Sequence, residues 1–477
     1  MNDTVNSDRR TLPVLATVSG AVALIMAAQS GLLVAMPTIA RSLPASPTAA
    51  QWILDTYALT LAALLLPAGA LSDRYGRRRL LVIGLVVFAL GSAMLAMAGS
   101  PAPAIAARVV MGLGAALAYP PTLATITATF PPERRRQGIS VWGAATILGS
   151  FFGLFIAAVA MSLSSWRAIG WTYAIAAGVT AVATIFIVPE SAAEDHQPRD
   201  IVGGLLAVVS MGSLVGAIIE SPRQGVGSPW IVTGLIVGLG GIVAFIGWEL
   251  RTPAPLLDVR ALTGAWTIAG MVGLVGMYVT AYGSLSVSSF YLVTGRGYSP
   301  LIAGSMTLVY GGLLMPAAGV AALWARRIER RAAVLISLVA MGLGCEVLSL
   351  ITTQSGLGIW IAGALIAGAG VGFGQAPTTE LVVASLPDSA QGVASAVNDL
   401  MREVGAAVGI AIGGAVLTAH RGHSGVASVD FIAGWRATTL VQAFIVLVVM
   451  VVVATLTAAP RPARFGQPAL VTDVGGR

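Results

Sequence analysis

Apolar runs of about 20 residues recur along the whole chain, and they constrain its fold more than any other feature. At 1.5 Å per residue, a helix of that length crosses the ~30 Å hydrocarbon core of a bilayer. Of the 477 residues, 56% are hydrophobic and only 10% are charged, which leaves too few charged groups to cover a soluble core of this size. We therefore predict an all-α polytopic membrane protein with fourteen spans, at residues 14–36, 50–71, 80–99, 103–129, 139–162, 168–188, 200–220, 230–250, 265–291, 300–324, 332–352, 357–384, 393–418 and 436–458.

The arginines indicate the orientation of these spans. All 27 basic residues are arginine, and 19 of them fall in the two tails and in the loops after even-numbered spans. Six fall in the alternate loops, and two, Arg108 and Arg402, fall within spans. By the positive-inside rule, this distribution predicts a plasma-membrane protein with both termini in the cytoplasm. Membrane orientation accounts for the net charge of +7, so we expect no nucleic-acid partner.

The remaining composition argues against several classes of protein. The single cysteine, Cys345, leaves no internal disulfide and no cysteine-ligated metal cluster, and we predict no metal site. The three histidines lie in predicted loops, and neither a Ser-His-Asp arrangement nor a G-x-x-x-x-G-K-S/T phosphate loop is present. These features argue against a membrane-embedded enzyme. A nontransporting receptor would need a sizeable soluble output domain, and the longest polar tail is 460–477.

The loop between the second and third spans has an unusual charge pattern. Residues 69–79 read GALSDRYGRRR, with an acidic residue inside a cluster of arginines. Gly76 permits a tight turn, because a residue without a Cβ adopts positive φ at little cost. The arginines alone are explained as a topology anchor, but the acid and the glycine are not.

This loop resembles the signature loop of the major facilitator superfamily, which reads G-x-L-x-D-R-x-G-R-R. The matching residues are Gly69, Leu71, Asp73, Arg74, Gly76, Arg77 and Arg78. The resemblance implies a conformational latch, in which the aspartate pairs with an arginine and with a helix N-terminus of the other half. That pairing favours one transport state.

Three further stretches resemble the fourteen-helix drug:proton antiporter branch of this superfamily: residues 52–57, 107–114 and 398–405. The resemblance implies a six-helix bundle at 1–190, two additional helices with linkers at 191–262, a second six-helix bundle at 263–459 and a cytoplasmic tail at 460–477. A weak internal repeat agrees with this division, because Arg326 and Arg330 keep the spacing of Arg74 and Arg78 eight spans earlier.

Two departures from that branch stand out. The first span has Ala28 where many relatives carry an aspartate. The fifth span reads GLFIAA at 153–158, where the antiporter motif has G-P-x-x-G-G. We expect the missing proline and glycines to remove a kink and a close-packing surface.

Charged residues inside the membrane are costly, so each should face a cavity or a partner. Asp55 lies ~7 Å into the second span and Arg108 lies ~9 Å into the fourth, so we expect them at similar depth near the outer face. An arginine favours the ionised carboxylate and burial favours the neutral acid, so Asp55 is a candidate for proton exchange. The alternative is that Asp55 is simply solvated at a helix start.

Two glutamates complete the set of proton and substrate coupling candidates. Glu403 lies ~15 Å into the span at 393–418, near the membrane centre. Its alternative interpretation is an interhelical salt bridge. Glu380 lies on the span at 357–384, nearer the cytoplasm, and by family resemblance that span lines the cavity.

Aromatic side chains suit a flat or cationic guest, and we select Tyr57, Tyr278 and Tyr282 as candidates for the substrate cavity. The two later tyrosines are spaced i, i+4 and so share one helix face. The alternative for any single aromatic is ordinary packing or an interfacial position.

The sequence thus predicts proton-coupled efflux of lipophilic, cationic drugs or toxic compounds by alternating access. The proton gradient supplies the energy, no cofactor is expected, and we expect a monomer in the lipid bilayer. The closest alternative is a dedicated exporter of a single endogenous natural product.

Overall fold

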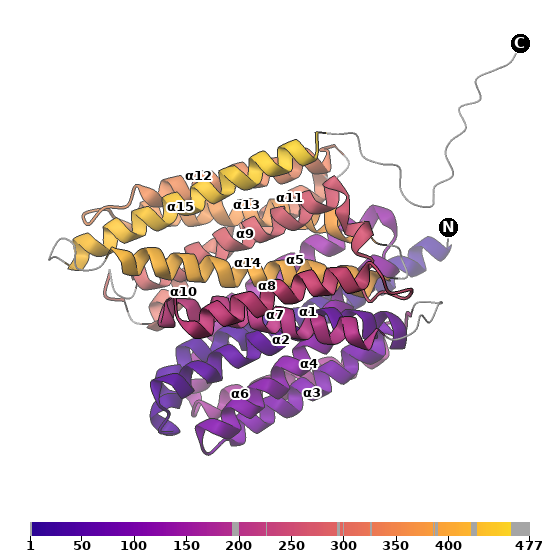
Figure 1. Cartoon of the computed structure of the whole chain (residues 1–477), viewed down its shortest axis with the longest axis horizontal. Helices are drawn as coiled ribbons and strands as arrows, with labels where there is room; N and C mark the ends of the chain where they lie inside the picture. The colour runs from indigo at the N-terminus through magenta and orange to yellow at the C-terminus, as the bar shows by residue number, and fades with distance from the viewer. Residues whose placement is uncertain are drawn as a thin grey trace, which may run out of the picture.

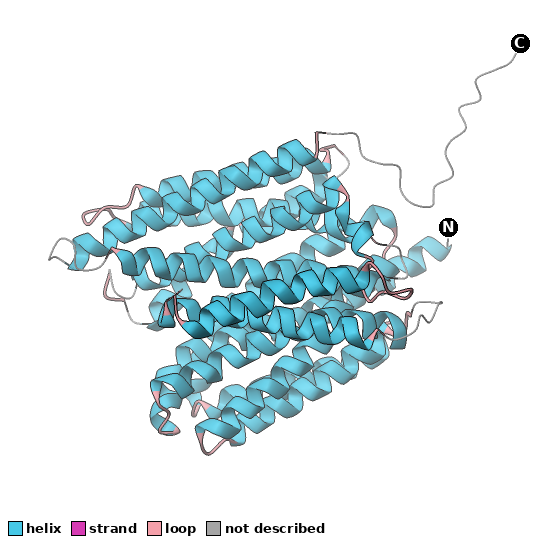
Figure 2. Cartoon of the chain, in the orientation of Figure 1, coloured by secondary structure: helices cyan, strands magenta, loops and turns pink. Residues whose placement is uncertain are grey.

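The computed structural model describes residues 2–192, 200–225, 227–292, 296–298, 300–324, 327–384, 386, 390–420 and 427–458. Helices joined by short loops make up this part of the chain, without strands (Figure 2). The α-helices are α1 (Asn2–Ser42), α2 (Pro47–Tyr75), α3 (Arg77–Met97), α4 (Pro101–Thr129), α5 (Pro132–Leu163), α6 (Arg167–Ile187), α7 (Ile201–Gln224), α8 (Pro229–Glu249), α9 (Ala265–Phe290), α10 (Pro300–Gly312), α11 (Leu314–Trp324), α12 (Arg330–Ser349), α13 (Leu357–Val383), α14 (Gln391–Ala419) and α15 (Ala427–Leu456). A short 3-10 helix, η1 (Val259–Thr263), precedes α9.

The helices account for all fourteen predicted spans. Thirteen of the described helices are long and apolar enough to cross a membrane. The predicted tenth span is divided into α10 and α11, which are separated at Leu313. Pro316 has no N–H to bond to the carbonyl of Gly312, so the helix loses a backbone bond at this point. The protein is therefore an all-α, multi-pass membrane protein.

Helices α1–α6 pack among themselves, and so do α9–α15 (Figure 1). Helices α7 and α8 pack against each other, and α7 contacts both α2 and α14. The inserted pair, α7 and α8, therefore lies at the boundary between the two halves. The predicted tail at 460–477 and Arg326 of the predicted repeat lie outside the described residues.

Helix α1 begins and α15 ends at the same end of the bundle, on the right of Figure 1. Helix α2 ends at this end, α3 and α5 begin there, and so does α12. We call it the arginine-rich end, because it carries Arg77–Arg79, Arg134–Arg136, Arg330 and Arg331.

The fifth helix corrects one expectation. The departure at 153–158 predicted the loss of a close-packing surface, yet α5 packs tightly on α1. A Cβ built on Gly153 would lie 2.2 Å from the carbonyl oxygen of Ala27, and one on Gly149 would lie 2.5 Å from that of Ala23. These two glycines maintain the close approach because they have no side chain to displace the facing backbone.

Candidate functional site

Asp73 joins the two halves at the arginine-rich end. One carboxylate oxygen accepts a hydrogen bond from the N–H of Gly392 at 2.7 Å, and the other accepts from the N–H of Val393 at 3.0 Å. Arg77 lies 3.1 Å from the same carboxylate. Because α14 begins at Gln391, these N–H groups belong to its first turn, which has no acceptor within the helix and carries the positive end of the helix dipole. Asp73 therefore serves α14 as a capping residue supplied by α2.

Two glycines make this contact sterically possible. A Cβ on Gly69 would lie 2.6 Å from the carbonyl oxygen of Gly392, so α2 and α14 could not approach as closely with any other residue. Gly76 has φ = +101°, as its position in the predicted turn requires. A Cβ there would also lie 2.5 Å from the carboxylate of Glu190.

Glu190, which sequence reasoning did not single out, braces the same loop. Its carboxylate accepts from the N–H of Arg78 at 3.1 Å and lies 3.6 Å from the guanidinium nitrogens of Arg78 and Arg79. The guanidinium of Arg74 lies 5.6 Å from the centre of the Tyr75 ring. Glu190 lies just after α6 and 112 positions from Arg78, so no local spacing links it to the loop.

Glu380 forms a second contact between the halves at this end. Arg136 of α5 donates to both carboxylate oxygens, at 2.9 and 3.0 Å, and Arg330 of α12 donates at 2.7 Å. In this structure the carboxylate of Glu380, predicted as a coupling acid, is held in ion pairs with these two arginines. The family pattern placed its helix beside the cavity but did not indicate which cations its carboxylate meets.

Asp399, Arg402 and Glu403 lie near the middle of α14. The amide of Gln29, on α1, donates to Glu403 at 3.3 Å, so this hydrogen bond crosses between the halves. Arg402 is 1% exposed and lies between two rings, with its guanidinium carbon 4.7 Å from the ring centres of both Trp142 and Tyr278. Since Trp142 is on α5 and Tyr278 on α9, Arg402 also contacts both halves. We call Gln29, Trp142, Tyr278, Asp399, Arg402 and Glu403 the central cluster.

Asp399 balances part of the charge of Arg402. The two side chains are 3.9 Å apart, and Asp399 is fully buried. Among the described residues, neither the Nε of Arg402 nor the Oδ2 of Asp399 has a hydrogen-bond partner. Buried polar groups are ordinarily paired, and a buried polar atom without a partner is costly. The central cluster therefore has hydrogen-bonding capacity beyond its own contacts.

The tyrosines selected from the sequence have different surroundings. Tyr278 and Tyr282 stack with ring centres 5.7 Å apart, and their hydroxyls contact Gln375 at 3.2 Å and Ser150 at 3.3 Å. Tyr282 also lines a small cavity of about 30 Å³ between α5, α9, α10, α11 and α13. Tyr57 is fully buried, and its hydroxyl donates to the carbonyl of Ile25. It packs within the N-terminal half because it faces α1 and α3 rather than the other half.

Arg108 and Asp55 are at similar depth, but the hydrogen bonds described for Arg108 are donated to backbone carbonyls. Its guanidinium donates to the carbonyls of Ile53 at 2.9 Å, Ala28 at 3.2 Å and Leu54 at 3.4 Å. It thereby ties α4 to α1 and α2. Asp55 accepts from Gln51 at 2.8 Å and lines a pocket formed with α7 and α8.

Sequence reasoning missed three members of the central cluster. Asp399 precedes Arg402 by three residues, so helical spacing alone would have indicated that they share a face. Gln29 adjoins Ala28, the position where the expected acid is absent, and it supplies a neutral partner for Glu403 instead. Trp142 carries no signal in the sequence, because its role depends on how α5 meets α14.

Comparison with known proteins agrees with this architecture. A family model described as Major Facilitator Superfamily matches residues 18–287 and 277–471. The multidrug resistance protein Stp of Mycobacterium tuberculosis is 29% identical over 387 residues, which cover 81% of this chain and 72% of Stp. The multidrug efflux pump LfrA of Mycolicibacterium smegmatis is 31% identical over 426 residues, which cover 87% of this chain and 82% of the pump.

A solved structure supports the fold. The crystal structure of the human organic anion transporter MFSD10 superposes with a TM-score of 0.63, covering 91% of this chain and 99% of that chain at 18% identity. At this level of identity the likeness concerns the arrangement of helices alone.

Proposed function

Because the chain belongs to the Major Facilitator Superfamily, we propose that it exports lipophilic, cationic compounds in exchange for protons. Transport itself follows from the family. The observation that carries the finer proposal is the central cluster, in which Glu403 and Arg402 of one half contact Gln29 and Trp142 of the other at mid-membrane. Support for drug export comes from Stp and LfrA, whose names describe multidrug resistance and multidrug efflux.

The geometry suggests how a proton and a cationic guest would compete. An ionised Glu403 attracts a cation, and the stacked rings of Tyr278 and Tyr282 offer a flat apolar surface beside it. A proton entering from outside would neutralise Glu403 and remove that attraction. The guest would then leave outward, and the proton would pass to the cytoplasm when the site faced inward.

The two halves would move around this cluster by alternating access. Asp73 and Glu380 join the halves at the arginine-rich end, which we propose faces the cytoplasm. Both contacts must break before that end can open. We propose that Asp73, with Gly69, Arg74, Gly76, Arg77 and Arg78, forms the conformational latch and stabilises the state closed at this end.

The test is efflux of a fluorescent lipophilic cation from cells that express the protein, with and without an uncoupler. We expect efflux against the gradient that stops when the uncoupler is added. If the protein exports none of the cations tested but does export one neutral or anionic compound, the proposed substrate class is contradicted. That result would support a dedicated natural-product exporter. Efflux that continues unchanged with the uncoupler would contradict proton coupling.

A further inference from the structure

Asp399 is a fully buried acid that the proposed exchange of a guest for a proton does not use. One of its carboxylate oxygens accepts a hydrogen bond from the amide of Asn398 at 3.0 Å and lies 3.9 Å from the guanidinium of Arg402. Asp399 precedes Arg402 by three positions and Glu403 by four, so all three lie on neighbouring parts of one helix face. A single cation on α14 is therefore placed beside two acids.

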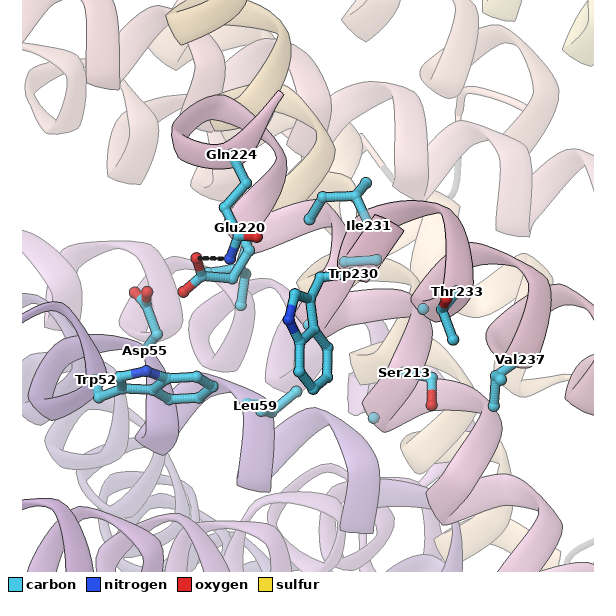
Figure 3. A pocket seen from close by; sticks show the side chains of 15 residues that line it. Trp52, Asp55, Leu59, Ser213, Glu220, Gln224, Trp230, Ile231, Thr233 and Val237 are labelled. Carbon is cyan, nitrogen blue, oxygen red and sulfur yellow. Dashed lines mark hydrogen bonds between the residues drawn. The ribbon is translucent and has the colours of Figure 1, made fainter. Parts of the chain in front are cut away.

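The helices around these three residues contribute uncharged groups. The described titratable side chains that face Arg402 or Glu403 from α2, α4 and α9 are phenols: Tyr57, Tyr119, Tyr278 and Tyr282. A phenol is neutral near pH 7. Helices α1 and α5 contribute the amide of Gln29 and the indole of Trp142. Asp55 lines a separate pocket between α2, α7 and α8, which shares no residue with the central cluster (Figure 3).

The charges of the three side chains can be compared in the two protonation states of Glu403. When both acids are ionised, the group carries one net negative charge, and when Glu403 is protonated it carries none. If Asp399 were uncharged, the same two states would carry no net charge and one net positive charge. Since uncompensated charge is costly inside a membrane, protonation of Glu403 would then be opposed, and its ionised form would no longer attract a cation.

We propose that Asp399 is a positioning residue for the exchange, because it neutralises Arg402. Glu403 then determines by itself whether the central cluster attracts an organic cation or is neutral. Asp399 acts through Arg402 and contacts neither the guest nor the exchanged proton. This inference rests on the proposed function and adds a residue to it.

A role in packing alone would rank two substitutions in the opposite order. Asn has almost the shape of Asp but no charge, whereas Glu keeps the charge and is one methylene longer. In a fully buried position, the longer side chain would be overpacked. Packing therefore predicts that Asp399→Asn is the milder change, and neutralisation of Arg402 predicts that Asp399→Glu is.

The test measures two properties of the full-length protein, each per amount of folded protein judged by size-exclusion chromatography. The first is binding of radiolabelled tetraphenylphosphonium, an organic cation, to purified protein. The second is proton movement driven by the same cation in liposomes. We expect Asp399→Asn to weaken binding and slow proton movement by about tenfold, as for the loss of one nearby opposite charge. Asp399→Glu should keep both within about threefold of the wild type.

A double variant removes both charges of the pair. Asp399→Asn combined with Arg402→Met leaves Glu403 as the one charged residue of the three, and the flexible Met side chain packs well against aromatic rings. The group again alternates between one net negative charge and none. We expect binding and proton movement to recover from the level of Asp399→Asn to within about threefold of the wild type. Two independent packing defects would instead add.

Glu346→Gln is the matched control, because it removes an acid from an exposed position on α12. It should leave both measurements unchanged. Wild-type behaviour of Asp399→Asn, a larger loss in Asp399→Glu than in Asp399→Asn, or a folded double variant that is worse than Asp399→Asn would each overturn the inference. If the double variant does not fold, the order of the two single variants decides.

The same experiment separates this inference from the proposed function. If the wild type binds the cation and moves protons, and Asp399→Asn does so equally well, the role of Asp399 alone is contradicted. If the wild type binds the cation without moving protons, proton exchange is contradicted, and the binding data decide whether Asp399 neutralises Arg402. A wild type that neither binds the cation nor moves protons would overturn both proposals.

Discussion

The two contacts that join the halves at the arginine-rich end differ in what they use as partners. Asp73 binds two backbone N–H groups at the start of α14, whereas Glu380 binds the side chains of Arg136 and Arg330. Backbone groups in a helix cannot move away when their acceptor is lost. Arginine side chains can, because their long apolar stems allow the charged head to reach the membrane surface.

This difference predicts unequal consequences. Loss of the Asp73 charge leaves two buried donors poorly satisfied, a cost that nothing nearby can relieve. Loss of the Glu380 charge frees two arginines that can find water or lipid headgroups. Both changes weaken the closed state, but the first should weaken it more.

The largest effect is expected for Asp73→Asn. The amide keeps the size of the side chain but lacks the charge and one of the two acceptor oxygens. Hydrogen bonds to charged groups are worth about 1.5–3 kcal/mol, so the balance between states should shift by about 10- to 100-fold. Efflux per folded protein should fall accordingly. Asp258→Asn is the control, since Asp258 accepts from Arg260 in an exposed turn. A loss of expression equal to the loss of efflux would indicate a folding role instead.

Gly69→Ala tests the same contact by shape alone. The new Cβ would lie 2.6 Å from the carbonyl oxygen of Gly392 and 2.7 Å from the Cβ of Ala396, so α2 and α14 must move apart. Overpacking of this kind costs about 1–3 kcal/mol, and we expect efflux to fall by about tenfold. Gly178→Ala on α6 should be neutral, because a Cβ there meets nothing within 4 Å. Normal efflux in Gly69→Ala would mean that the two helices need not approach closely.

Glu380→Gln should have a smaller effect, a loss of efflux of about three- to fivefold, because Arg330 is partly exposed and can be solvated. The double variant with Asp73→Asn should lose the product of the two factors if both contacts stabilise the same closed state. An effect of Glu380→Gln larger than that of Asp73→Asn would reverse the comparison. Complete loss of proton-coupled transport would instead support Glu380 as a coupling acid.

Glu190→Gln should have the smallest effect, less than about twofold. Its carboxylate braces Arg78 and Arg79 from the linker after α6, but both ion pairs are long and solvent-exposed. The measurement is again efflux per folded protein. A loss comparable to that of Asp73→Asn would show that the linker belongs to the latch.

The sequence predicted the fold well because apolar length is a local property. Predicted and observed spans agree closely at most ends, but α5 begins at Pro132 and α15 at Ala427, several residues before the predicted starts. Helices continue past the hydrocarbon core, where hydropathy no longer marks them. The break at Leu313 was not predicted. A proline such as Pro316 is an ambiguous signal, since Pro377 lies inside α13 without interrupting that helix.

The candidate site was predictable only where its signal was local. The Asp73 loop keeps a fixed spacing within eleven residues, so its residues could be identified together. The pairing of Glu380 with Arg136 joins residues 244 positions apart, and that of Gln29 with Glu403 joins residues 374 apart. Such contacts depend on how the two halves meet, which no periodicity within one helix records.

The most direct test of the account concerns Glu403, the acid that we propose exchanges the proton. The protein is reconstituted in liposomes with an imposed pH gradient, and substrate-driven proton movement is measured beside substrate exchange. We predict that Glu403→Gln, which preserves size and removes the titrating group, abolishes proton movement and uphill efflux while exchange continues. Proton movement at the normal rate in Glu403→Gln would contradict the account, since the mid-membrane acid would then be structural.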